Sequence, residues 1–396
     1  MAPGPRIVLY TGKGGVGKTS VAAATARRLA ADGRRVLVLS TDPAHSLADV
    51  LGRPIGAEPT AVAERLDGLQ VDPQAELTRH WSAVRAWAGR SLVGRGVDRI
   101  SAQELTVPPG LEELLALLRI VELRDRGDHD AIVVDCAPAG ETLRLLAFPE
   151  IARWWLDRIV PRQGELLGAA RPLARAVLDI TVPDGEVLDE LGRLMANLLA
   201  MRELLCDGDA LSVRLVTTAD RIVVDEARRT YTYLSLHGIA TDAIVVNRLF
   251  PADVGAYFAG WRDRQQALLE EIDAAFAPLP VLRAPYYDAE VIGDAALDRL
   301  AAALYPDHDP AARLHPGHGR ELVVEGDVAR LRIAVGLAER GEVGLRRSGD
   351  ELVVEVAGRR RTVLLPDPIA HYRPHEATLR DGTLEVTLRA PVAAER

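Results

Sequence analysis

Short apolar runs separated by helical segments make up the first three-quarters of the chain. Runs rich in β-branched residues occur at 7–10, 35–40, 68–71, 131–136, 213–217 and 243–247, with a weaker run at 280–283. Strands that alternate with helices indicate βαβ units and a parallel sheet. The pattern therefore predicts an α/β domain over residues 1–305.

Two long insertions, at 74–126 and 150–208, interrupt the strand pattern. Their apolar residues recur at three- and four-residue spacing, most clearly between 187 and 205. We expect these insertions to form one helical subdomain beside the sheet. The apolar stripes fit two alternatives that the sequence leaves open: packing into the core, or a groove for an apolar partner.

The periodicity changes near the end of the chain. Residues 306–320 are rich in Pro, Gly and His, which predicts a linker. Its three histidines, His308, His315 and His318, have neither a cysteine nor a fixed helical spacing, so a metal site is not favoured. From 321 to 396, short alternating runs separated by turns such as 380–382 predict a β-sandwich. That domain shows no triad, cysteine or metal cluster, so catalysis is expected in the first domain.

Lysine usage gives the strongest chemical signal. The chain has 48 basic residues, and only Lys13 and Lys18 are lysines. Both lie in the segment GKGGVGKT, which fits the phosphate-loop pattern G-x-x-x-x-G-K-[ST] between a strand and a helix. A compact ammonium fits a tight backbone loop where the planar arginine fork does not. The predicted ATP-binding loop comprises Gly12, Gly14, Gly15, Val16, Gly17, Lys18, Thr19 and Ser20.

Each residue type in this loop has a chemical role. Lys18 should contact the β- and γ-phosphates of ATP, and the Thr19 hydroxyl should bind Mg²⁺. An early lysine such as Lys13 is typical of the deviant form of the loop. If the chain follows that class, Lys13 reaches the nucleotide of a partner subunit, as an arginine finger does.

Polar residues at three strand ends complete the candidate site. Asp42 could orient or deprotonate the attacking water, and Asp135 could bind Mg²⁺ through a water molecule. The Gly140 backbone N–H is a candidate sensor of the γ-phosphate, and the Asn247 amide could contact the adenine edge. Structural alternatives remain: a helix N-cap for Asp42, a strand-end turn for Asp135 and a local turn for Asn247.

Bulk composition excludes several classes of protein. The net charge of −9 disfavours nonspecific binding to nucleic acid or anionic membranes. Two cysteines, Cys136 and Cys206, give no disulfide framework and fit a reducing cytoplasm. No run approaches the roughly 18 apolar residues of a membrane helix, and the first strand leaves no space for a signal peptide. We expect a cytoplasmic protein whose membrane role, if any, depends on a partner.

Four further motifs carry a family resemblance. With the loop, "TDPAHSL" at 41–47, "DCAPAGETLRLL" at 135–146, "VVNRLFP" at 245–251 and "PYYDAEVIG" at 285–293 resemble the arsenite-pump and tail-anchored-protein-targeting ATPases over about residues 5–305. The resemblance implies a doubly wound sheet with a helical cap and a homodimer. It also implies that Asp42 activates water, that Asp135 is the switch carboxylate and that Asn247 and Pro285 border the adenine.

The chain departs from that family at several positions. Eukaryotic targeting members hold a dimer-clamping Zn²⁺ with a C-x-x-C pair, and residues 250–280 contain no cysteine. Arsenite-pump members bind the metalloid with several cysteines and carry two phosphate loops. Here the helical region offers only Cys206, and the chain has one loop, so a homodimer must supply the second. Glu141 also stands where relatives often have His.

The last 75 or so residues resemble the α-crystallin domain of small heat-shock proteins, through "RRRTVLLP" and "ATLRDGTLEVTL". The short connection at 356–360 predicts no strand swap between partners. We expect an ATP-gated homodimer that captures apolar helical segments of client proteins or contacts a membrane-embedded partner. The alternatives are an energising subunit of an anion or arsenite pump and a low-turnover regulatory switch.

Overall fold

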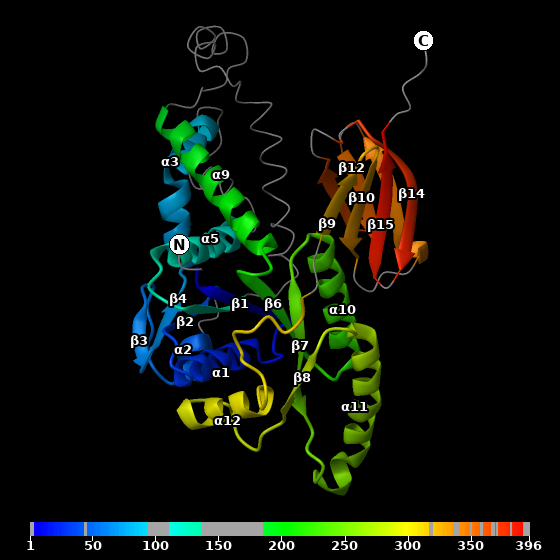
Figure 1. Ribbon diagram of the computed structural model, residues 1–396. Helices are drawn as coiled ribbons and strands as arrows, with labels where there is room; N and C mark the ends of the chain where they lie inside the picture. Colours follow the sequence, from blue (N-terminus) through cyan, green and yellow to red (C-terminus); the bar gives the residue numbers. More distant parts are fainter. Residues whose placement is uncertain are drawn as a thin grey trace, which may run out of the picture.

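The first domain is built on one large sheet (Figure 1). The computed structural model describes residues 4–42, 46–93, 111–136, 185–316, 320–335, 340–348, 351–356, 359–365, 369, 371–380 and 382–390. Eight strands lie in the order β3-β4-β2-β5-β1-β6-β7-β8, and only the β3–β4 pair is antiparallel. The strands are β1 Arg6–Gly12, β2 Val36–Ser40, β3 Thr60–Ala63, β4 Leu66–Gln70, β5 Ala131–Asp135, β6 Leu211–Thr218, β7 Thr241–Leu249 and β8 Val281–Pro285.

Helices cover both faces of this sheet. In β1, Ile7 and Leu9 enter one hydrophobic core while Val8 and Tyr10 enter the other, because successive side chains of a strand point to opposite faces. One core contains α1, α2 and α12, and the other contains α3, α5, α9, α10 and α11. The predicted doubly wound, mostly parallel sheet is confirmed. The helices are α1 Lys18–Ala31, α2 Ser46–Leu51, α3 Pro73–Val93, α5 Leu111–Arg126, α9 Gly185–Cys206, α10 Arg221–Leu236, α11 Gly255–Phe276 and α12 Asp294–Leu304.

The described parts of the two insertions are helical and pack together. Helices α3, α5 and α9 contact one another, and α9 also contacts β6. Along α9 the stripe residues with described burial include Val187, Leu194, Leu198 and Leu204, all at most 3% exposed. These residues are therefore core and do not form an open groove. Residues 94–110 and 150–184 of the predicted subdomain lie outside the described residues.

The second domain is a two-sheet β-sandwich, as predicted. One sheet has the order β14-β15-β10-β9 and the other β11-β12-β13. Inward-facing residues of both sheets, such as Leu331 and Val386 from one and Val354 from the other, form a single core. The strands are β9 Arg320–Glu325, β10 Val328–Ala334, β11 Val343–Ser348, β12 Glu351–Val356, β13 Arg359–Leu364, β14 Arg373–Arg380 and β15 Thr383–Arg389.

Neither β3 nor β11 was predicted from the sequence. Strand β3 has only four residues and is half exposed, so it carries little apolar signal. Strand β11 contains Gly344, Arg346 and Arg347, which break the apolar alternation. The connection between β12 and β13 is short, because Val356 pairs with Arg359 across it. This confirms the tight connection; the absence of a strand swap stays a prediction.

The segment predicted as a linker is packed against the ATPase sheet. Arg214 on β6 and Asp242 on β7 are fully buried and lie 3.1 Å apart. The Arg214 guanidinium also donates to the Ala312 carbonyl at 3.1 Å, and the Leu314 backbone N–H donates to Asp242 at 3.3 Å. Residues 312–314 are thus held by a buried ion pair. The amino-acid composition of the segment gives no sign of this contact.

The sandwich also touches the first domain directly. Leu236, the last residue of α10, belongs to the hydrophobic core of the sandwich, and α10 contacts β10. Figure 1 shows the sandwich at the end of α10. Among the described helices, none combines the length and apolarity needed to cross a bilayer.

Candidate nucleotide site

The predicted phosphate loop connects β1 to α1 and requires glycine at two positions. Gly12 has φ 152°, and a Cβ there would collide with the carbonyl of Val216 on β6. Gly17 has φ 90° and forms the N-cap of α1, where a Cβ would collide with the Asn247 side chain. Only glycine tolerates both the backbone conformation and the close approach. The loop is therefore fixed by its two neighbours, β6 and β7.

Lys18 occupies the centre of this loop. It is the first residue of α1, is 6% exposed, and its ammonium donates to the Lys13 carbonyl at 3.2 Å. The N-terminus of α1 has no side-chain cap. Free helical N–H groups and a buried ammonium are the features that favour an anion at this position, and the binding of the phosphates here stays a prediction. Ser20 follows in the first turn of α1, and Gly14 and Gly15 are exposed on the outer side of the loop.

An oxygen-rich cluster lies beneath the loop. Thr19 Oγ1 donates to Asp135 Oδ2 at 2.8 Å and lies 3.1 Å from the Ser46 hydroxyl. Ser40 Oγ also donates to Asp135 Oδ2, at 3.2 Å. The start of α1 and the end of β2 thus contact the carboxylate at the end of β5, and the start of α2 joins the cluster through Thr19.

Asp135 has the properties of a cation-binding carboxylate. Its side chain is fully buried, and Oδ1 has no hydrogen-bond partner among the described residues. Burial raises its pKa to about 6, although the hydrogen bond from Thr19 and the charge of Lys18 oppose that shift. Mg²⁺ prefers hard oxygen ligands, which Thr19 and Asp135 supply. The residues present therefore fit a Mg²⁺ ion, and the alternative of a simple strand-end turn does not explain the unpartnered oxygen.

Asp42 lies beside this cluster at the end of β2. Its backbone N–H donates to Ser40 Oγ at 3.2 Å, and its carbonyl accepts from the Gln70 amide at 2.9 Å. Helix α2 begins four residues later, at Ser46, so Asp42 is not the N-cap of that helix. Its position next to the Asp135 cluster is compatible with the predicted role on the attacking water, which stays a prediction. Gly140 and Glu141 lie outside the described residues.

Lys13 pairs with a residue of helix α10 and is partly exposed. Its ammonium lies 3.6 Å from a carboxylate oxygen of Glu226 on α10 of the same chain. Both side chains are about two-fifths exposed, so the pair contributes little to stability. The predicted contact with a partner's nucleotide is not tested by a single chain.

Asn247 has a structural role that the sequence did not indicate. Its amide nitrogen donates to the Val16 carbonyl at 2.9 Å, and its oxygen accepts from the Arg248 backbone N–H at 2.9 Å. Asn247 therefore holds the phosphate loop in place. Pro285 lies close by, because it pairs with Leu249 at the end of β7. Contact of Asn247 and Pro285 with adenine stays a prediction.

Three supporting residues of the site were missed as functional from the sequence. Ser40 and Gln70 are buried polar residues at the ends of two apolar strands, and Ser46 starts α2 within a motif already singled out. A buried polar residue at the end of an otherwise apolar strand is the signal that identifies the first two. Glu226 gave no such signal, because it lies on an ordinary amphipathic helix.

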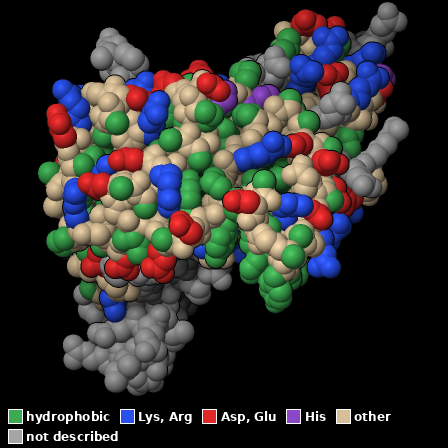
Figure 2. All heavy atoms as spheres, turned by 90° about the horizontal axis from the view of Figure 1, so that it is seen from below, with side chains coloured by type: hydrophobic (Ala, Val, Ile, Leu, Met, Phe, Trp, Pro, Cys, Tyr) green, Lys and Arg blue, Asp and Glu red, His purple; other side chains and the backbone are tan. Residues whose placement is uncertain are grey.

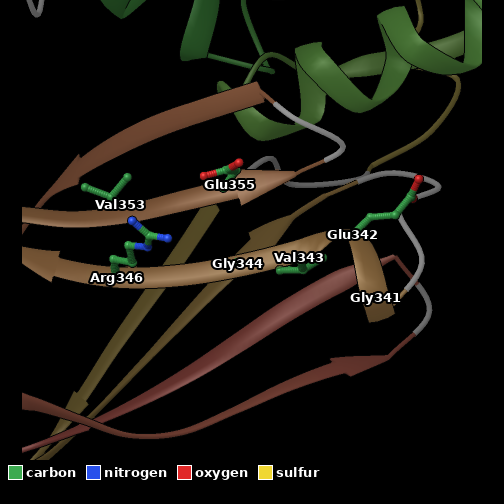
Figure 3. Close-up of a pocket in the computed structure, with 7 residues that line it drawn as sticks. All are labelled: Gly341, Glu342, Val343, Gly344, Arg346, Val353 and Glu355. Carbon is green, nitrogen blue, oxygen red and sulfur yellow. The ribbon is translucent and has the colours of Figure 1, made fainter.

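The other sequence candidates do not assemble into a site. Among the described residues, no group of three or more His, Cys, Asp or Glu is placed to hold a metal ion, and His318 lies outside them. Cys136 is buried, and burial raises the pKa of its thiol to about 12; Cys206 is exposed. Figure 3 shows a surface pocket of about 260 Å³ on the sandwich, away from the phosphate loop. Its lining residues are Gly341, Glu342, Val343, Gly344, Arg346, Val353 and Glu355.

Comparisons with known proteins agree with this geometry. The family of anion-transporting ATPases matches residues 5–306, and the HSP20-like domain found in ArsA matches residues 326–388. A putative arsenical pump-driving ATPase of Chlorobaculum tepidum is 36% identical over 388 residues, covering 96% of this chain and 95% of that protein. The putative arsenical pump-driving ATPase 1 of Aquifex aeolicus is 31% identical over 383 residues, covering 94% of this chain and 97% of that protein. The ATPase get3 of Aspergillus terreus is 30% identical over 319 residues, covering 77% and 92%.

Proposed function

Because the chain belongs to the anion-transporting ATPase family, we propose that it is a Mg²⁺-dependent, cytoplasmic ATPase that works as a homodimer and captures apolar protein segments according to its nucleotide state. The proposal rests on one observation: the loop that contains both lysines lies next to the cluster around Asp135. ATPase activity follows from membership of the family. The Mg²⁺ ion, the homodimer, the cytoplasmic location and the capture of apolar segments are what we propose.

The arrangement of the site supports a separate role in ATP hydrolysis for each of its residues. Lys18 and the first turn of α1 bind the phosphates, where positive charge stabilises the transition state of phosphoryl transfer. Thr19 and Asp135 would hold Mg²⁺, which supplies charge neutralisation at the phosphate oxygens. Asp42 orients or deprotonates the attacking water. Lys13 supplies a further positive charge to the partner's nucleotide, by analogy with an arginine finger.

Client capture is supported by features outside the loop. The helical subdomain and the sandwich are two surfaces of the kind that apolar segments could bind, and the sandwich resembles a domain of small heat-shock proteins. The described part of the α9 stripe is buried, so that stripe is not the binding surface in this conformation. Nucleotide-driven rearrangement of the helical subdomain is the step that the proposal requires.

A defined peptide probe tests the capture step. Asp42→Asn is expected to bind Mg·ATP without hydrolysing it, which fixes the ATP-bound state. A labelled peptide with a 20-residue apolar helix should then bind to this variant, and a peptide with four lysines placed in that helix should not. Addition of Lys18→Ala should abolish the difference. Equal binding of both peptides, or binding without nucleotide, would contradict ATP-gated capture.

The names of the matched relatives favour one alternative, an energising subunit of an arsenite pump. The cysteine content opposes it, because Cys136 is buried and only Cys206 is exposed. Arsenite is held by several thiolates, and one accessible thiol cannot provide them. Arsenite should therefore leave the ATPase rate unchanged. Stimulation that disappears in Cys206→Ser would support the pump subunit instead, and a dimer with very slow turnover and no peptide binding would support a regulatory switch.

A further inference from the structure

A short segment between the ATPase domain and the sandwich is hydrogen-bonded to the large sheet. We call residues 309–314 the strap. Arg6 on β1 donates to the Ala311 carbonyl at 3.0 Å, and the Leu314 backbone N–H donates to Asp242 on β7 at 3.3 Å. In Figure 1 the chain runs from α12 through this segment toward β9, the first strand of the sandwich. The strap is therefore the stretch of chain through which the ATPase domain can act on the sandwich.

The strap supplies acceptors to two arginines that share one carboxylate. Arg214 and Arg6 both pair with the fully buried Asp242, at 3.1 and 3.5 Å. Their remaining acceptors include the carbonyl oxygens of Ala311 and Ala312. Burial lowers the pKa of Arg6; Asp242 opposes that shift and the charge of Arg214 adds to it. Release of the strap would leave two buried cations with too few acceptors, so the strap and this charge group must change together.

Three buried hydroxyl groups connect Arg214 to helix α1. The Tyr10 hydroxyl lies 2.8 Å from the Thr25 hydroxyl and 2.6 Å from that of Tyr305, and Thr25 and Tyr305 are 3.0 Å apart. Thr25 donates to the Val21 carbonyl, so it accepts from one tyrosine, and that tyrosine accepts from the other. Arg214 donates to both tyrosine oxygens, at 3.3 and 3.1 Å. Each hydroxyl therefore depends on the other two.

Helix α1 is also bonded to α12 and to the strap at its surface. Arg27 on α1 pairs with Asp294 at 2.7 Å and with Asp298 at 2.8 Å, both on α12. Arg34, which follows α1, makes two hydrogen bonds to Asp309 of the strap, at 2.7 and 2.6 Å. Figure 2 shows acidic and basic side chains interspersed over the lower face of the molecule. Exposed pairs are individually weak, so the buried hydroxyl groups are the stronger connection between α1 and the strap.

We propose that ATP binding at the phosphate loop stabilises the strap in its bonded position on the sheet, so that the nucleotide state controls how firmly the sandwich is held. A ligand stabilises the contacts that its binding-competent conformation requires, and α1 begins in the loop. ATP therefore favours the position of α1 in which Thr25 meets the two tyrosines. By linkage, release of the strap lowers the affinity for ATP by the same factor. The inference rests on the nucleotide site of the proposed function and acts within a single chain.

Hydrogen exchange in the full chain, with and without a non-hydrolysable ATP analogue and Mg²⁺, tests the proposal. The analogue should slow amide exchange in residues 310–316 about fivefold or more. Tyr305→Phe should still bind the analogue but show less than about a twofold slowing, because the hydroxyl connection is broken. Tyr372→Phe is the matched control; it removes a hydroxyl that donates to the Gly326 carbonyl within the sandwich, and the full response should remain.

The outcomes separate the strap from the nucleotide site. Full slowing in Tyr305→Phe would overturn the connection through the hydroxyl groups. Analogue binding without any slowing in the wild-type chain would overturn the proposal and leave the nucleotide site intact. A wild-type chain that does not bind the analogue would instead overturn the nucleotide site on which the proposal rests.

The reciprocal effect gives an independent measurement on an exposed residue, which is less critical for folding. Asp309→Ala removes the acceptor of Arg34 and of the Ala311 backbone N–H, at a distance from the phosphate loop. The dissociation constant of a fluorescent ATP analogue should rise about two- to fivefold, as expected for loss of an exposed pair. Asp307→Ala is the matched control, because Asp307 is also exposed and makes no hydrogen bond or ion pair with a described residue. Equal affinities of the two variants would contradict coupling between the strap and the nucleotide.

Discussion

Asp135 combines two properties that are unfavourable in a purely structural residue. Its carboxylate is fully buried, and one oxygen has no partner in the described part of the chain. Burial of an ionised group without full compensation costs free energy, and the raised pKa of Asp135 reflects that cost. A bound divalent cation would remove the cost, because it places a positive charge near the unpartnered oxygen. Under the proposed function, Asp135 would therefore be stabilised by the same ion that it helps to bind.

Replacement of Asp135 by Asn should separate binding from turnover. The amide still accepts the hydrogen bond from Thr19 but carries no charge for Mg²⁺. We expect kcat to fall about 10- to 100-fold, the range for losing a residue that orients a metal through water. Calorimetric titration with ATP should show that Mg²⁺ no longer strengthens binding. Asp67→Asn, at the opposite end of β4, from which β5 is separated by β2, is the control; a comparable loss there would indicate general destabilisation.

The two lysines should respond differently to replacement by arginine. Lys18 is buried among loop carbonyls, so a planar guanidinium does not fit, and Lys18→Arg should abolish nucleotide binding. Lys13 is about two-fifths exposed, so Lys13→Arg should bind ATP as before. Hydrolysis should fall about 10³-fold, because the wide guanidinium fork cannot take the place of the compact ammonium at the partner's nucleotide. Steady-state ATPase assays and equilibrium binding distinguish the two. Normal turnover in Lys13→Arg would refute a contribution from the partner subunit.

At the scale of elements, the phosphate loop depends on β6 and β7 as much as on its own glycines. Gly12 packs against the backbone of β6, and Gly17 packs against Asn247 of β7. Asn247 in turn bonds the Val16 carbonyl. The loop is therefore shaped by strands that lie about 200 residues away in the sequence, which keeps it organised before nucleotide binds.

Gly17→Ala tests this organisation. The new Cβ would meet the Asn247 amide in a backbone conformation that alanine avoids, at a cost of about 1–3 kcal/mol. The melting temperature without nucleotide should fall by several degrees, and nucleotide binding should be lost. Gly14→Ala is the matched control, because its Cβ would enter open space. Equal melting temperatures for the two variants would show that the loop is not held by β7.

The sequence was sufficient for those elements whose signal is local. The apolar runs identified seven strands of the large sheet because a buried parallel strand is apolar throughout. The loop was found because its glycines and lysines have a fixed spacing. Contacts between distant segments determine the features that the sequence did not predict. These are strands β3 and β11, the pairing of Lys13 with Glu226 and the hydrogen bond by which Asn247 holds the phosphate loop. Contacts of this kind produce no periodic pattern in the sequence, so they are seen only in the folded structure.

At the scale of the whole molecule, a buried polar network unites the first domain with the segment that follows it. Arg214 links Asp242, the Tyr305 hydroxyl and the Ala312 carbonyl. Arg6, at the start of β1, donates to the Ala311 carbonyl and pairs with Asp242 as well. The segment predicted as a linker is therefore fixed at several points, which limits where the sandwich can lie.

Arg214→Met tests how much this polar network contributes to the free energy of unfolding. The substitution leaves Asp242 as a buried charge with only partial compensation, for which a loss of about 3–5 kcal/mol is usual. Thermal unfolding should occur at a clearly lower temperature, and limited proteolysis should cleave faster within 306–316. Arg35→Ala breaks an exposed pair with Asp130, which water screens, and should leave the thermal unfolding temperature almost unchanged. Similar effects of the two substitutions would show that burial does not strengthen the network.

Leu236 has a consequence for the ancestry of the chain. One leucine at the end of α10 completes the interior of the sandwich, although it is encoded within the ATPase domain. In a chain without the sandwich, this side chain would be exposed to water, and selection would favour a polar residue there. The identity of this single position should therefore follow the gain or loss of the second domain across the family, so that a genome survey of the ATPase domain alone could indicate which ancestors carried the sandwich.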